Sequence, residues 1–245
     1  MSTIGTVNAQ LRRRILVSYA LDAAVAARLL PNPFRPHLVS GRAVGGFCMI
    51  GLRSVRPGWI APAIGLRTEN AAHRMGIEWD ENGQTRTGVY IFERHSSSLL
   101  PILAGGRFFP GVQKHARFEL RETETRFHVE MRAPDAYALA DVELSNAWSS
   151  SLFGTVDAVS DFYRQGAIGW SPRRNGEGAE PLRLTSQTWS IEPARIREIR
   201  SSFFDSFPGG SAELDNAVIM RNQPLVWDVP PAAHRRGNVR RPIGA

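Results

Sequence analysis

The sequence predicts one β-dominated α+β domain with a barrel-like or strongly curved sheet. Most segments show the alternating or continuously apolar pattern of strands, and only a few show the caps of short helices. No internal repeat appears at the period of a solenoid or a propeller. Many strands with a few short helices between them favour a single curved sheet.

The N-terminal part begins with a strand expected over residues 11–20. Asp22 then caps a short helix over residues 23–30, which Pro31 stops. Further prolines make the segment after Pro31 an irregular loop. Residues 43–52 are apolar on both alternating sets, which is typical of a strand covered on both faces.

The remaining elements follow from turns, caps and alternation. An Asn82-Gly83 turn between residues 68–79 and 85–94 predicts a β-hairpin. Residues 155–165 form a capped helix that ends at Gly166. The other expected segments are a helix over residues 96–104, a loop over residues 172–181, and strands over residues 112–120, 126–132, 137–144, 182–191, 195–203 and 212–220.

Composition narrows the class of protein. The chain has 245 residues, of which 42% are hydrophobic and 22% charged, so wholesale disorder is excluded. Cys48 is the only cysteine, which excludes a fold built on intramolecular disulfides. We expect a single domain over residues 1–228 and a flexible basic tail over residues 229–245.

The net charge of +7 does not by itself predict a nucleic-acid-binding face. Four arginines in the tail, which has no acidic residue, carry four of these charges and leave +3 on the rest of the chain. No basic stripe interleaved with aromatic residues accompanies them. We therefore expect a solvated tail and no nucleic-acid partner, with phosphate contact by the tail as the alternative.

No segment predicts a membrane helix, because residues 43–52, the longest strongly apolar run, fall short of the roughly 18 residues that a span needs. Asp22 interrupts the apolar residues after the Arg12-Arg13-Arg14 run, which argues against a signal peptide and favours a cytoplasmic protein. Phosphate-loop, dinucleotide-binding and nucleophile-elbow motifs are absent, and the six histidines lack zinc-site spacing. We expect neither a metal nor a cofactor.

Lys114 is the candidate nucleophile. It is the only lysine among 30 Lys and Arg residues, and a guanidinium cannot replace an amine that forms an imine. Alternation over residues 112–120 places Lys114 on an apolar, core-directed face, which also carries Val112, Ala116 and Leu120. Burial there would lower its pKa from about 10.4 to about 7–8, where the amine reacts at neutral pH. One alternative is that Lys114 has no special role and is a lysine by chance. Another is that its ammonium group reaches the rim or pairs with a carboxylate.

Glu69 and His73 are the candidates for acid–base chemistry. Alternation over residues 68–79 places both on the face of Met75 and Ile77, which we expect to be buried. They either line an internal cavity beside Lys114 or form a satisfied pair in the core. A β-bulge in this strand would reverse the assignment of the faces.

Residues 106–107 and the GVQKHA sequence at residues 111–116 form a short motif. It resembles a motif of the acetoacetate decarboxylase superfamily. More broadly, the chain is similar to a bacterial branch of that fold whose function is unknown. The segments that carry this resemblance are residues 30–36, 43–57, 69–74 and 103–118, with weaker matches at Trp189 and residues 201–204, and together they extend through about Trp227.

The resemblance implies a cone-shaped β-barrel with an internal cavity. In the decarboxylases a lysine forms a Schiff base with a β-keto acid, and the iminium accepts the electrons released as carbon dioxide leaves. Lys114 falls where that lysine would fall, and Glu69 corresponds to the family's active-site glutamate. Arg35 corresponds to the arginine that holds a substrate carboxylate. Gln113 and His115 depart from the family motif, which has a proline and a second lysine at these positions.

Two hypotheses of function follow. The first is a cavity enzyme of the decarboxylase, aldolase or dehydratase type, which acts on a small keto acid or aldehyde through Lys114. Glu69 would be its general acid or base, with His73 assisting, and Arg35 would bind the substrate carboxylate. The second is a non-catalytic protein of the same fold that binds a small molecule, with Lys114 as a polar anchor. A homo-oligomer is compatible with both.

Overall fold

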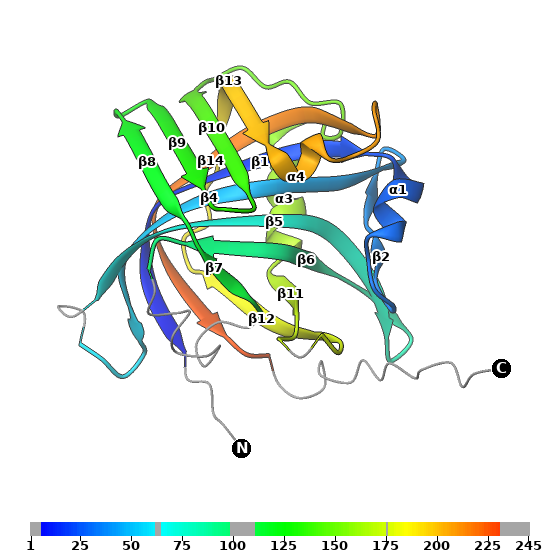
Figure 1. Ribbon diagram of the computed structural model, residues 1–245, viewed down its shortest axis with the longest axis horizontal. Coiled ribbons are helices and arrows are strands. Elements are labelled where there is room, and N and C mark those ends of the chain that lie inside the picture. Colours follow the sequence, from blue (N-terminus) through cyan, green and yellow to red (C-terminus); the bar gives the residue numbers. More distant parts are fainter. Residues whose placement is uncertain (1–5, 62–64, 99–110, 175, 231–245) are drawn as a thin grey trace.

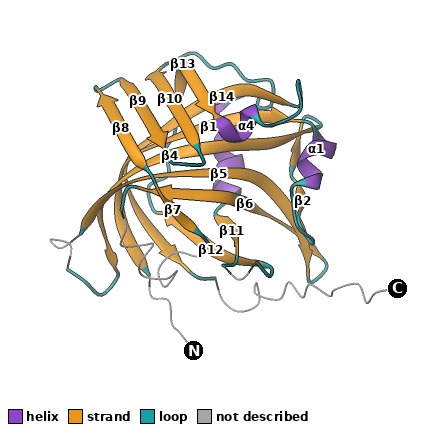
Figure 2. Ribbon diagram, in the orientation of Figure 1, coloured by secondary structure: helices purple, strands orange, loops and turns teal. Residues whose placement is uncertain are grey.

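The computed structural model describes residues 6–61, 65–98, 111–174 and 176–230. Its strands form one hydrogen-bonded network, and the helices α1 (Ala23–Arg28), α3 (Val156–Gln165) and α4 (Ser202–Asp205) are short (Figure 1; Figure 2). The predicted β-dominated α+β fold class is thereby confirmed. No helix within these ranges is long and apolar enough to cross a membrane.

Five long neighbouring strands form the centre of the molecule. In spatial order they are β14 (Ala212–Asp228), β1 (Val7–Leu21), β4 (Arg42–Pro57), β5 (Leu66–Glu81) and β6 (Gln84–Ser96). Each pairs antiparallel with the next. The free edges of β14 and β6 each pair with two different strands, so the network divides there into two closed rings that share these five strands.

The first ring closes through β11 (Ile168–Pro172) and β12 (Ala179–Ser186). β11 pairs parallel with residues 89–90 of β6 and antiparallel with β12, and β12 pairs with residues 225–228 of β14. Helix α3 packs into the interior of this ring. Its Phe162 and Tyr163 belong to the same buried apolar cluster as Leu16 and Cys48.

The second ring closes through β13 (Glu192–Ser201), β10 (Tyr137–Leu144), β9 (Arg126–Arg132), β8 (Arg117–Glu122) and β7 (Gln113–His115). β13 pairs with residues 217–219 of β14, and β7 pairs parallel with residues 94–96 of β6. Ala116 then links β7 to β8 along the chain. In Figure 1, β8, β9 and β10 cross above the shared strands, while α3 lies behind β5.

The shared strands have one face in each ring, so adjacent residues are buried in different cores. On β1, Ile15 lies in the second-ring cluster and Leu16 in the first; on β4, Met49 and Cys48 divide in the same way. Residues 43–49 are accordingly all buried. This confirms the prediction of a strand covered on both faces.

Local chemistry accounts for the elements that the sequence predicted well. The strands expected over residues 126–132 and 137–144 have those bounds. Asp22 accepts a hydrogen bond from the N–H of Val25 at 2.8 Å, and Thr155 accepts one from the N–H of Ala158 at 3.1 Å, so both helix caps are confirmed. Asn82 and Gly83 have φ angles of 51° and 75°, as a two-residue hairpin turn requires.

Other expected elements differ from the structure. Ala116 interrupts the strand expected over residues 112–120. The strand expected over residues 195–203 ends at Ser201, and α4 begins at the next residue, Ser202. Two short strands, β2 (Arg35–Pro36) and β3 (Leu38–Val39), lie in and just after the segment expected as a loop. The expected helix over residues 96–104 and the tail lie largely outside the described residues. A single domain over residues 1–228 stays a prediction.

Candidate functional site

Lys114 lies in the second ring, in a cluster of charged and polar side chains. β7 places it beside His95 of β6 in the parallel pairing. Its Nζ atom lies 2.5 Å from Oδ2 of Asp135 and 3.5 Å from Oε1 of Glu93, so the ammonium donates to two carboxylates. The Lys114 side chain is 38% exposed. Solvent therefore reaches the amine from one side.

The ion pairs hold Lys114 in its charged form. The hydrogen bond to Asp135 is the main cause that raises the pKa of Lys114 above its ordinary value; it outweighs burial, and Glu93 acts in the same direction. Lys114 in turn lowers the pKa of Asp135. The expectation that burial lowers the pKa of Lys114 is therefore wrong. The alternative of an ammonium paired with a carboxylate is the arrangement in the structure.

Alternation predicted the facing of the middle of this segment but not of its two ends. Val112 and Leu120, expected on the buried face, are 50% and 38% exposed, whereas Ala116 is buried. Ala116 belongs to neither strand, and its N–H donates to the backbone oxygen of Ser96 at 3.0 Å. Phe118 packs against the same second-ring cluster that contains Ala116, so the alternation from Lys114 continues as far as Phe118. Val112 lies before β7, and Leu120 lies in the second half of β8.

His73 is a buried neutral imidazole that reaches the same cluster. Its Nε2 lies 3.0 Å from the hydroxyl of Ser201, and its ring stacks on Phe203 with centroids 5.0 Å apart. Its Nδ1 lies 4.0 Å from Oε2 of Glu93, the carboxylate that also contacts Lys114. Burial, with a smaller effect of His95, lowers the pKa of His73 to about 3. The structure thus brings His73 and Lys114 together through Glu93.

His95 is a member of this cluster that the sequence reasoning missed. It is buried, and neither ring nitrogen has a hydrogen-bond partner among the described residues. Burial is the main cause that lowers the pKa of His95, against the opposing effect of Glu93. Glu93 and His95 are two residues apart on β6, so alternation could have placed both side chains on one face. Asp135, in the turn between β9 and β10, has no such signal.

Glu69 lies in a different cluster of the second ring. Its carboxylate accepts a hydrogen bond from Nη2 of Arg13 at 2.7 Å and lies 3.6 Å from Nη2 of Arg12. Arg13 is 1% exposed and also forms an ion pair with Glu122. Burial raises the pKa of Glu69, and Arg13 opposes this effect. Within the described residues, no contact joins Glu69 to Lys114.

Gly51 makes the Arg13–Glu69 ion pair possible. It lies between Arg13 and Glu69 in the register of β1, β4 and β5. A Cβ atom at Gly51 would lie 2.4 Å from Nη1 of Arg13 and 3.2 Å from Oε2 of Glu69. The absence of a side chain at this position therefore leaves the space in which the two charged groups meet.

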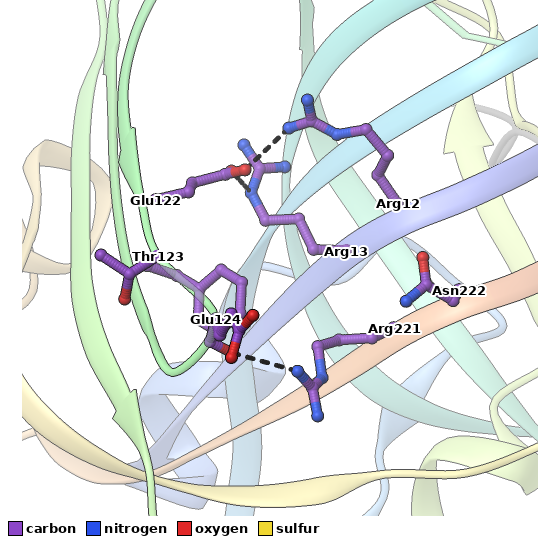
Figure 3. A pocket seen from close by; sticks show the side chains of 8 residues that line it. Arg12, Arg13, Glu122, Thr123, Glu124, Arg221 and Asn222 are labelled. Atoms are coloured by element: carbon purple, nitrogen blue, oxygen red, sulfur yellow. Dashed lines mark hydrogen bonds and ion pairs between the residues drawn. The ribbon is translucent and has the colours of Figure 1, made fainter.

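A surface pocket of about 460 Å³ opens beside this ion pair, between β1, β14 and the turn from β8 to β9. Figure 3 shows Arg12 and Arg13 pointing toward Glu122, and Arg221 pointing toward Glu124. Arg12 and Arg13 are thus paired with Glu122 inside the pocket. Arg221 instead donates to the backbone oxygen of Glu124 and forms its ion pair with Glu192, outside the pocket lining. This arrangement does not favour a ligand of one particular charge.

Arg35, the predicted carboxylate-binding residue, lies at the tip of the hairpin formed by β5 and β6. Its guanidinium donates to both Oδ atoms of Asp80, at 2.9 and 3.0 Å, and to Glu78 at 3.3 Å. The side chain is exposed. The described contacts do not bring Arg35 to Lys114, Glu69 or His73. The part of the chain with described coordinates also contains no group of three or more residues placed to bind a metal ion.

No protein-family model and no curated protein matches the sequence. Solved structures match it over most of its length. An acetoacetate decarboxylase-like enzyme from Sphingomonas wittichii RW1 has a TM-score of 0.57 at 12% identity, and the match covers 92% of this chain and 91% of that one. Acetoacetate decarboxylase from Legionella pneumophila has a TM-score of 0.53 at 12% identity, with 90% and 87% covered. The enduracididine biosynthesis enzyme MppR, complexed with pyruvate, has a TM-score of 0.52 at 10% identity, with 91% and 87% covered.

At identities of 10–12%, the matches show that the folds are alike. They do not show a shared reaction, because proteins of one fold catalyse different reactions. The predicted acetoacetate decarboxylase-like fold is confirmed. Assignment to the branch of unknown function stays a prediction. The chain therefore has the acetoacetate decarboxylase-like fold, with its only lysine in a cluster of two carboxylates and a neighbouring buried histidine.

Proposed function

We propose that the protein binds a small keto acid or aldehyde and that Lys114 forms an imine with its carbonyl group. The observation that carries the proposal is the contact of Lys114 Nζ with Asp135 and Glu93. Glu93 can accept the proton that the ammonium must lose before it becomes a nucleophile, while Asp135 holds the amine in its charged form until then. The fold match to acetoacetate decarboxylase and to MppR complexed with pyruvate supports a carbonyl compound as the ligand.

The chemistry starts with transfer of one ammonium proton to Glu93. The free electron pair of Nζ then forms a bond to the carbonyl carbon, while the C=O π electrons move to oxygen, which takes up a proton. Loss of water gives the imine. Once protonated, the imine accepts the electron pair of an adjacent C–C or C–H bond, as decarboxylation, aldol cleavage and dehydration all require.

Two histidines, His73 and His95, lie near Lys114. Because the pKa of His73 is about 3, its imidazole is neutral at pH 7 and does not donate a proton as an imidazolium. Its Nε2 lies within hydrogen-bond distance of the Ser201 hydroxyl, and its Nδ1 lies 4.0 Å from Glu93. His95 lies beside Lys114 in the pairing of β6 with β7. The roles of Glu69 as general acid or base and of Arg35 as carboxylate ligand stay predictions.

Borohydride trapping tests the proposal. The protein is incubated with a pool of small keto acids and aldehydes, sodium borohydride is added, and the intact mass and peptide map are measured. Because Lys114 is the only lysine, the N-terminal amine is the only other amine to distinguish. We expect an adduct on Lys114 that is absent in Lys114→Ala and in the charge-retaining Lys114→Arg. A folded wild-type protein that gives no Lys114 adduct at any pH up to 10 would refute it.

A second candidate function is binding of a small molecule without covalent chemistry. The observation that favours it is the raised pKa of Lys114, which keeps the amine charged at neutral pH. A ligand detected by calorimetry, with no adduct on Lys114 and equal affinity in Lys114→Arg, would establish this second function. An adduct that forms with the same ligand would establish the first.

A further inference from the structure

Three arginine side chains point into the first ring, on the opposite face of the shared strands from Lys114. They are Arg14 of β1, Arg74 of β5 and Arg94 of β6. The guanidinium carbon of Arg74 lies 4.6 Å from the ring centroid of Tyr163, which projects from α3 into this interior. Arg94 donates from Nε and Nη2 to the hydroxyl of Ser171 on β11, at 3.2 and 3.0 Å.

Within the described residues, these three arginines lack the ion pairs that the buried Arg13 makes. No carboxylate of the described residues lies within ion-pair distance of Arg14, Arg74 or Arg94. The Nε atoms of Arg14 and Arg74 are buried without a hydrogen-bond partner in the described structure. Burial lowers the pKa of Arg14 and lowers the pKa of Arg94 to about 10, and the nearby Cys48 side chain opposes this effect for both. A buried guanidinium that lacks a counter-ion is costly, so this interior favours an anion as an additional partner.

A cavity of about 100 Å³ opens beside Arg94 inside the first ring. Thr68, Asn70 and Gln113 contribute polar groups to its wall, and Ile50, Leu52 and Trp227 contribute apolar surface. Gln113 and Lys114 are consecutive residues of β7, so this short strand presents one side chain to each ring. A cavity with one cation, a few polar groups and apolar walls is typical of a site for a small organic anion.

We propose that the first ring binds a short-chain carboxylate through Arg94, with Arg14 and Arg74 supplying further positive potential. Nε and Nη2 of Arg94 already donate to Ser171, which leaves Nη1 and the second proton of Nη2 to form two parallel hydrogen bonds with a carboxylate. The cavity volume limits the ligand to about three to five carbons. This site is independent of imine formation at Lys114, because Lys114 does not line the cavity and its amine contacts Glu93 and Asp135 in the second ring.

Isothermal titration calorimetry of the wild-type protein tests this site without any variant. Butyrate is titrated in one experiment and butyramide, its neutral isostere, in another. We expect butyrate to bind at least about tenfold more tightly, because only the carboxylate neutralises Arg94. Equal affinities for the two, or no binding of butyrate or of its three- and five-carbon homologues, would overturn the proposal.

Variants then locate the site. Arg94→Gln should weaken butyrate binding by about tenfold or more. The matched control Arg164→Gln, at an exposed arginine of α3 that pairs with Asp161, should bind as the wild type does. Lys114→Ala should also leave butyrate binding unchanged, which separates this site from the proposed imine chemistry. Binding that is lost in Lys114→Ala but kept in Arg94→Gln would assign the anion to the second ring and overturn the proposal.

Discussion

The two rings share five strands but differ in how their charged side chains are compensated. In the second ring, Lys114 and Arg13 lie against carboxylates supplied by β5, by β6, by the end of β8 and by the turn after β9. In the first ring, Arg14, Arg74 and Arg94 have no ion pair among the described residues. Charged side chains that are paired with each other leave little affinity for a charged ligand. A buried cation without a counter-ion instead favours binding of an anion from solution.

Removal of the Glu69 carboxylate is expected to have the largest effect on stability. Glu69→Ala leaves the buried Arg13 with Glu122 as its remaining counter-ion, and breaking a buried ion pair on one side is strongly destabilising. We expect a loss of about 3 kcal/mol in the free energy of unfolding, measured by urea denaturation. The control Asp80→Asn, in an exposed pair with Arg35, should cost less than about 1 kcal/mol. Equal losses in both variants would contradict the account of the second ring.

Gly51→Ala tests the Arg13–Glu69 ion pair by removing the room it occupies, with both charges kept. The added Cβ atom would lie 2.4 Å from Nη1 of Arg13, so the guanidinium must move away from Glu69. A loss of about 1–3 kcal/mol is expected from denaturation curves. At Gly209 a Cβ atom meets nothing within 4 Å, so Gly209→Ala should change stability by less than about 0.5 kcal/mol. A Gly51→Ala protein as stable as the Gly209→Ala control would show that Arg13 needs no such space.

His73 predicts a dependence of stability on pH. Its pKa of about 3 in the folded protein lies below the ordinary value of 6.5, so only the unfolded chain binds a proton at this residue between these values. Its contribution to stability is complete above pH 6.5 and is lost as pH falls toward 3. His73→Gln should reduce the slope of unfolding free energy against pH in this window by up to about 1.4 kcal/mol per pH unit. An unchanged slope in the variant would show that His73 is not held neutral.

The smallest effect on the free energy of unfolding is expected for Arg14→Met, in the first ring. Arg14→Met replaces a buried cation without an ion pair by an apolar side chain of similar length, a change that is often neutral or stabilising. We expect the ligand-free variant to differ from the wild type by less than about 1 kcal/mol in urea denaturation. A loss of 3 kcal/mol, comparable to that of Glu69→Ala, would mean that Arg14 is compensated within the chain and would remove the contrast between the rings.

Local signals were sufficient for many elements and for part of the candidate site. The Asn82-Gly83 turn and the caps at Asp22 and Thr155 depend on neighbouring residues, so the sequence predicts them. Alternation on β5 also placed His73 on the face that reaches Lys114 through Glu93.

The closure of the two rings depends on pairings that no local pattern specifies. β14 pairs with β1, β12 and β13, which lie far apart in the sequence. The partners of Lys114 have the same origin: Glu93 comes from a neighbouring strand, and Asp135 from a turn 21 residues further along the chain. The pKa of Lys114 follows from these partners, which is why the alternation of its own strand gave the wrong direction.

The pH profile of borohydride trapping tests the central claim most directly. Trapping of a keto acid on Lys114 is measured from pH 6 to pH 10 in the wild type and in Asp135→Asn. Because Asp135 is the main cause of the raised pKa, the wild-type adduct should increase steeply toward alkaline pH, and the variant should give several-fold more adduct at pH 7. Identical profiles, or no adduct on Lys114 in either protein, would contradict the claim that Lys114 is an imine-forming amine that Asp135 keeps protonated at neutral pH.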